Sequence, residues 1–146
     1  PIIQLLYKAS QAGVRVDLVV RGVCCLRPGI PSVSDNIAVH SIVGRFLEHS
    51  RIYYFHHGGR ETILAGSADI MPRNLNQRVE VLFPIEDTRM VRYLRDEVLD
   101  VYLRDNIKSR RMLPDGSYQH AAPNKGDTLL NAQDYFLAAR LRSSHS

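Results

Sequence analysis

Apolar residues recur every three to four positions in four segments of the chain, and this spacing predicts four helices. The first covers residues 1–13, with proline in its first turn and glycine at its end. Polar residues that can cap a helix precede the second near residue 35 and the third near residue 87, and the last helix covers 131–141. The apolar positions of the second helix are Val39, Ile42, Val43, Phe46 and Leu47, and those of the third are Val91, Leu94, Val98, Val101 and Tyr102.

Segments rich in β-branched and aromatic residues lie between these helices and predict strands. Residues 14–20 are apolar on both sides, which is typical of a central parallel strand covered by helices. Residues 51–55 and 62–66 flank a glycine turn and predict a hairpin, and residues 78–83 alternate as a further strand. Strands interleaved with helices predict an α/β fold in which a mixed sheet is flanked by helices, with residues 1–146 forming a single domain.

Composition narrows the range of functions. The net charge of +4 is compatible with anionic ligands but too small to predict a nucleic-acid partner, and we expect none. Cys24 and Cys25 are adjacent, so a disulfide between them is not expected, and a reducing cytoplasm is the predicted compartment. No apolar run approaches the roughly 18 residues of a membrane span. The chain begins at Pro1 without an initiator methionine, and we expect it to be part of a longer protein.

The segment between the second predicted helix and the hairpin carries His49 and Arg51. The partial negative charge at the end of a helix favours the protonated imidazole, and a strand that starts at Arg51 would place both side chains on one face. Together they would make a receptor for a phosphoryl oxygen, with the imidazole as nucleophile or proton donor. The alternative interpretation is a helix-capping histidine beside a surface arginine.

Two further segments carry polar groups at the ends of predicted strands. The loop at residues 66–74 gathers hydroxyl, carboxylate, guanidinium and amide groups, and its Asp69 can orient His49 by accepting a proton from the ring nitrogen. Arg21 ends the apolar strand at 14–20, where a ligand would approach. A capped polar loop and a surface charge are the corresponding structural alternatives. The pair His56 and His57 has no third ligand at a suitable spacing, so no metal site is predicted.

The motif His49-Ser50-Arg51, followed by Gly66-Ser67-Ala68-Asp69, resembles the phospholipase D signature H-x-K and G-S-x-N, with Arg for Lys and Asp for Asn. Four ordered blocks that span nearly the whole chain resemble the C-terminal catalytic domain of polyphosphate kinase, the type with a phosphohistidine intermediate. These blocks are DLVVRGVCCLRPGIPSVSDNI, SIVGRFLEHSRIYYF, GSADIMPRNLNQRVEVLFPI and NAQDYF.

This resemblance implies a phospholipase-D-like half-domain and an ATP:polyphosphate phosphotransferase activity. In that family two such halves form one site, and the phosphorylated histidine lies in the other half. Arg21 and His49 match ligands of the ATP phosphates, and His49 would also assist transfer. Arg78, with Arg51 and Arg73, would line the path of ATP or of the polyphosphate chain. We therefore expect the isolated chain to be inactive.

The resemblance also implies partners that this chain does not itself contain. ATP or ADP and inorganic polyphosphate are the expected substrates, with Mg²⁺ held by ligands in the other half. The expected protein partners are the N-terminal, helical and first catalytic domains of the same polypeptide, in a homo-oligomer compatible with a peripheral position at a membrane. Two alternatives stay open: a phospholipase-D-like phosphodiesterase or nuclease half-site, and a non-catalytic module that binds polyanions.

Overall fold

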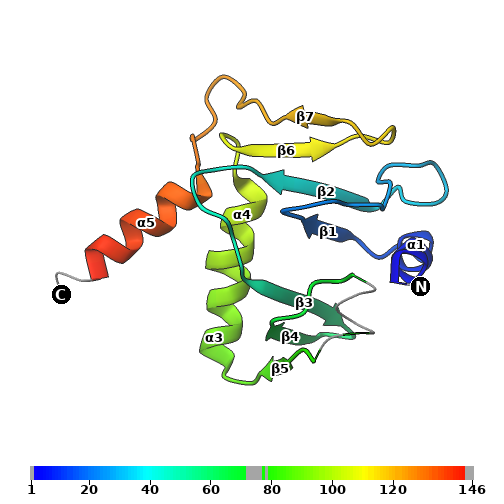
Figure 1. Cartoon of the computed structure of the whole chain (residues 1–146), viewed down its shortest axis with the longest axis horizontal. Coiled ribbons are helices and arrows are strands. Elements are labelled where there is room, and N and C mark those ends of the chain that lie inside the picture. The colour runs from blue at the N-terminus through cyan, green and yellow to red at the C-terminus, as the bar shows by residue number, and fades with distance from the viewer. Residues whose placement is uncertain (1, 72–76, 78, 144–146) are drawn as a thin grey trace. The chain divides into compact units, whose positions relative to one another are not determined.

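The computed structural model describes the backbone of residues 2–71, 77 and 79–143. The chain forms two units (Figure 1). Unit 1 consists of Pro1–Leu47 together with Val101–Ser146, and unit 2 consists of Glu48–Asp100. Unit 2 is therefore an insertion in the chain of unit 1, and each unit is described by itself below.

Unit 1 is built on a four-stranded mixed sheet in the order β1-β2-β6-β7 (Figure 1). The first two strands are parallel, and the other neighbours are antiparallel. The helix α1 precedes the sheet, α4 leads into β6, and α5 follows β7. The elements are α1 (Ile2–Gln11), β1 (Val16–Val19), β2 (Ile37–Ile42), α4 (Asp100–Arg104), β6 (Ser109–Met112), β7 (Tyr118–His120) and α5 (Ala132–Ser143).

The hydrophobic core of unit 1 lies on one face of this sheet. Side chains alternate between the two faces of a strand, so Ile37 and Val39 of β2 point to the same side, where they are 3% and 0% exposed. Leu26 and Met112 complete the buried cluster, and apolar residues of α1 pack against it. Each of these side chains contributes roughly 1.5–3 kcal/mol through burial.

Unit 2 contains a three-stranded antiparallel sheet in the order β3-β4-β5, followed by helical segments. Gly58 and Gly59 connect β3 to β4 with φ angles of 55° and 76°, the left-handed conformation that a two-residue type I′ turn requires. Asp87 caps the first helical segment by accepting hydrogen bonds from two backbone amides. The elements are β3 (Arg51–His57), β4 (Arg60–Gly66), β5 (Leu82–Ile85), α3 (Thr88–Arg92) and the π-helix η1 (Tyr93–Leu99).

The predicted α/β class, with a mixed sheet and helices, is confirmed, but the helix predicted at 35–47 is wrong. This segment forms β2 (Ile37–Ile42) and then bends. Its β-branched residues favour a strand, and the burial alternates over residues 37–40. Phe46 and Leu47, which completed the helical spacing, are 46% and 69% exposed. His49 therefore does not follow a helix, and the argument from a helix terminus does not apply to it.

Three other details differ from the prediction. The strand β1 pairs in parallel as expected, but it lies at the edge of the described sheet because β2 is its single neighbour there. The strand predicted at 78–83 forms later, as β5 (Leu82–Ile85), and residue 78 lies outside the described part of the chain. The hairpin β6–β7 was not predicted.

One buried carboxylate joins three elements of unit 1. Asp105 is 3% exposed and follows the end of α4. Its Oδ1 accepts hydrogen bonds from the backbone amides of Ile107, Lys108 and Ser109 at 3.0, 2.6 and 3.0 Å. Its Oδ2 accepts from the amide of Ala132, the first residue of α5, at 2.8 Å. The carboxylate thus fixes the start of β6 and the start of α5 to the end of α4.

We expect Asp105→Ala to lower the free energy of unfolding by about 3 kcal/mol or more, because it leaves several buried N–H donors without an acceptor. Urea unfolding followed by far-ultraviolet circular dichroism measures this loss. Asp127→Ala is the matched control, since Asp127 accepts bonds only inside an exposed turn among the described residues. Equal losses in the two variants would contradict the role assigned to Asp105.

Candidate functional site

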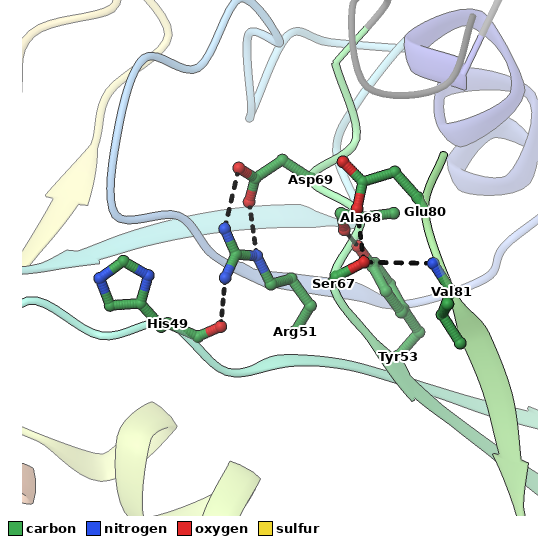
Figure 2. Close-up of polar contacts among 8 residues, drawn as sticks. All are labelled: His49, Arg51, Tyr53, Ser67, Ala68, Asp69, Glu80 and Val81. Carbon is green, nitrogen blue, oxygen red and sulfur yellow. Dashed lines mark hydrogen bonds and ion pairs between the residues drawn. The ribbon is translucent and has the colours of Figure 1, made fainter. Parts of the chain in front are cut away.

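Arg51 forms the central contacts of the candidate site. It is the first residue of β3, and its side chain is 18% exposed. Its Nε and Nη2 donate hydrogen bonds to Oδ1 and Oδ2 of Asp69 at 3.0 and 3.1 Å, a bidentate ion pair (Figure 2). Its Nη1 donates to the backbone carbonyl of His49. One guanidinium therefore connects the start of β3, the loop after β4 and the residue expected to contact phosphate.

The roles predicted for His49 and Asp69 need correction. Asp69 was expected to accept a proton from the ring of His49, but its carboxylate binds Arg51. Figure 2 shows that His49 presents its carbonyl, and not its ring, to the guanidinium. The exposed ring makes no hydrogen bond to any residue that the structure describes. Arg51 thus contacts the backbone of His49 and not its ring, and a joint phosphate receptor of imidazole and guanidinium stays a prediction.

The loop that carries Asp69 is fixed by several hydrogen bonds (Figure 2). The hydroxyl of Ser67 donates to the carboxylate of Glu80 and accepts from the amide of Val81 at 3.1 Å. The Ser67 amide donates to the Val81 carbonyl at 3.0 Å. The hydroxyl of Tyr53 donates to the carbonyl of Ala68, a residue that is 2% exposed.

A glycine makes this loop possible. A Cβ atom on Gly66 would lie 3.0 Å from the carbonyl carbon of Val81 and closer still to its oxygen. Sequence reasoning identified the loop but missed the contributions of Tyr53 and Glu80, because tyrosine in an apolar strand and a lone glutamate carry no local signal of such contacts.

The ion pair sets the electrostatics of this site. The hydrogen bond to Asp69 is the main reason that the pKa of Arg51 is raised above its usual value. Burial raises the pKa of Tyr53, the negative charge of Asp69 raises it further, and the guanidinium of Arg51 lowers it. Tyr53 therefore remains a neutral donor to the loop, and Arg51 remains a cation.

The remaining predicted site residues belong to other parts of the chain. Arg21 is exposed and lies in unit 1, after the end of β1, whereas His49 and Arg51 belong to unit 2. Arg73 and Arg78 lie outside the described residues. The structure thus brings together Arg51, Asp69 and the backbone of His49, and the assignment of Arg21, His49, Arg51, Arg73 and Arg78 as phosphate ligands stays a prediction.

The described residues form no metal cluster, no disulfide and no membrane-spanning helix. No group of three or more His, Cys, Asp or Glu side chains suited to a metal ion occurs among the residues described. Cys24 and Cys25 are both free thiols. Within the same part of the chain, no helix has the length and apolar character needed to cross a membrane.

Comparison with known proteins identifies the family. The profile described as polyphosphate kinase C-terminal domain 2 matches residues 1–133. The chain is 57% identical to a polyphosphate kinase of Pseudomonas aeruginosa over 132 residues, which are 90% of this chain and 19% of that protein. It is 49% identical to one from Halalkalibacterium halodurans over 146 residues, all of this chain and 21% of that protein.

A solved structure agrees with these matches. The crystal structure of polyphosphate kinase from Porphyromonas gingivalis has a TM-score of 0.88 and 41% identity, and the match covers 97% of this chain and 22% of that one. The fold and the relatives define the class first: this is a phospholipase-D-like half-domain from a phosphotransferase family. The family is polyphosphate kinase, and the chain belongs to it as C-terminal domain 2. It spans 19% of the length of the Pseudomonas aeruginosa relative.

We expect the Arg51–Asp69 pair to contribute a coupling energy of about 1–2 kcal/mol to stability, because it is bidentate and partly shielded from water. A double-mutant cycle of Arg51→Met and Asp69→Asn, measured by urea unfolding, gives this value. The pair Arg15–Asp17 is the control: its arginine is 83% exposed, so we expect a coupling below about 0.5 kcal/mol. Additive effects at Arg51 and Asp69 would show that their contact is not stabilising.

The same two substitutions should move the pKa of Tyr53 in opposite directions. Asp69→Asn removes a negative charge and lowers it toward the usual value of about 10, whereas Arg51→Met removes a positive charge and raises it. Carbon-13 NMR of the Tyr53 ring measures both shifts. Because the folded-state pKa is raised, the contribution of Tyr53 to stability is present below pH of about 10 and is lost as the pH rises through that folded-state pKa. Shifts of the same sign would contradict this arrangement.

Proposed function

We propose that the chain is the C-terminal catalytic lobe of a polyphosphate kinase, which reversibly transfers the terminal phosphate of ATP to inorganic polyphosphate. Membership of the family supports the reaction. The main structural support comes from the contacts of His49: its carbonyl is held by Arg51, while its exposed ring makes no hydrogen bond to the described residues. Both ring nitrogens are thus available to a ligand.

In this proposal His49 contacts the phosphates of ATP through its ring. Phosphoryl transfer needs little covalent chemistry from the protein beyond positioning and neutralisation of the charge on the transferred oxygens. An imidazole on a backbone held in this way can supply a proton or a hydrogen bond to those oxygens. Arg21 is the second phosphate ligand, and Arg78, with Arg73 and Arg51, lines the path of ATP or polyphosphate.

Arg51 and Asp69 also bear on the phosphodiesterase alternative. In the phospholipase D signature these positions are Lys and Asn. Here the guanidinium and the carboxylate form a bidentate ion pair, which Lys and Asn at these positions could not form. This internal pairing favours the kinase over a phosphodiesterase or nuclease half-site.

The proposal places the remaining parts of the reaction outside this chain. The phosphorylated histidine belongs to the other catalytic half, which with the N-terminal and helical domains would complete the polypeptide and its homo-oligomer. The ligands of Mg²⁺ are assigned to the other half as well, as the family resemblance implies. The free thiols support a cytoplasmic location.

We expect His49→Ala and Arg21→Ala to reduce ATP-dependent polyphosphate synthesis by the full-length enzyme about 100-fold or more, because each removes a group that neutralises developing charge. His56→Ala and Arg60→Ala are matched controls, since both residues are exposed on the β3–β4 hairpin. The isolated chain should make no polymer.

Three results would contradict the proposal. Synthesis by the 146-residue chain alone would exclude a split site. Hydrolysis of bis(p-nitrophenyl) phosphate that is abolished by His49→Ala would favour a phosphodiesterase. Polyphosphate binding without synthesis in the full-length protein, undiminished in both variants, would favour a module that binds through diffuse charge.

A further inference from the structure

We infer that Gln133 is a positioning residue for His49. This inference rests on the proposed function, because it concerns how the histidine is held for the reaction. Gln133 is the second residue of α5 and lies far from His49 in the sequence. It acts on the segment that leads from β2 to His49, which makes no ladder of backbone hydrogen bonds beyond Val43 among the described residues.

The side-chain amide of Gln133 binds both backbone groups of a single residue, Phe46. The amide of Phe46 donates to Oε1 of Gln133 at 2.9 Å, and Nε2 of Gln133 donates to the carbonyl of Phe46 at 2.7 Å. The two residues are 87 positions apart in the sequence. Gln133 is 4% exposed, so its side-chain amide is largely shielded from water and would be costly to leave without these two bonds. The amide thus takes the place of a neighbouring strand.

Two neighbouring features show that this contact is built into the fold. A Cβ atom on Gly44 would lie 2.7 Å from Cδ of Gln133, so glycine at this position leaves the space that the amide occupies. At the start of α5, Asp105 accepts a hydrogen bond from the backbone amide of Ala132, and the Asn131 side chain accepts one from the backbone amide of Gln133 at 3.2 Å. The first turn of α5, which carries Gln133, is therefore itself fixed.

In the sequence, His49 lies between Phe46, which Gln133 binds, and Arg51, which forms the ion pair with Asp69. Only Leu47 and Glu48 separate it from Phe46 on one side, and on the other side Arg51 donates to its carbonyl. The chain passes from unit 1 to unit 2 within this short segment. Restraint at both ends limits the positions open to the His49 backbone, and with it the ring, without any contact to the ring itself.

The glutamine side chain matches the backbone N–H and C=O of Phe46. Glutamine presents one acceptor and one donor at the end of its side chain. Leucine of similar size presents neither, so Gln133→Leu removes both bonds while it keeps most of the packing. Gly44→Ala disrupts the same contact without a change to Gln133, because the added methyl group displaces the glutamine amide.

A double-mutant cycle in the full-length enzyme tests whether Gln133 acts through His49. We expect Gln133→Leu and Gly44→Ala each to lower kcat/KM for ATP-dependent synthesis about 10-fold or more in the wild-type background. In the His49→Ala background the same changes should cost less than about 2-fold, because the group they position is absent. Gln119→Leu is the matched control: this glutamine is exposed on β7, and we expect no effect in either background. Equal losses in both backgrounds would overturn the inference and leave the proposed function intact.

Hydrogen–deuterium exchange in the full-length protein separates the inference from the proposed function. If Gln133 holds this segment, Gln133→Leu should accelerate exchange of a peptide that covers residues 43–50 about 10-fold, with exchange in β2 and β6 unchanged. If His49→Ala leaves turnover unchanged, the proposed function fails, and the exchange result alone then decides whether Gln133 positions this segment. Unchanged exchange at 43–50 would overturn the inference, whatever the activity.

Discussion

The bidentate ion pair between Arg51 and Asp69 is the interaction on which the candidate site depends. In the β3–β4 hairpin the glycine turn closes one end, and the ion pair closes the other, where Arg51 lies opposite Gly66. Because both charges belong to the protein, each is neutralised by the other when no ligand is bound. The pair therefore exists before substrate arrives, and the carbonyl of His49 is held by the same guanidinium.

In the candidate site, Arg51 binds the backbone carbonyl of His49 and is itself bound by Asp69. The imidazole of His49 remains exposed to solvent. In unit 1 the main chain is also held by polar side chains: the buried Asp105 binds backbone amides at a strand end and a helix end, and Gln133 binds both backbone groups of Phe46. The backbone near His49 is thus held by hydrogen bonds to main-chain groups, and none of these bonds involves its ring.

Local patterns in the sequence predicted those features that local physics controls. The first and last helices, the Gly58-Gly59 hairpin and the cap at Asp87 were all found, because each depends on residues a few positions apart. The strand β2 was missed because its apolar residues fit helical spacing as well, and only the burial of Val39 against Met112 decides between them. The Arg51–Asp69 and Phe46–Gln133 contacts span 18 and 87 residues, and no local pattern encodes them. The motif thus identified Arg51 and Asp69 as candidates, but it did not predict that they bind each other.

The insertion of unit 2 into unit 1 affects the order in which the two units can fold during synthesis. When the ribosome has made β1 and β2, the residues that complete their sheet have not yet emerged, because β6 begins only at Ser109. Unit 2 is contiguous in the chain and can fold in the interval. The nascent β2 must meanwhile keep an open edge and a half-formed core, which is the stage at which this domain is most exposed to aggregation and to chaperones.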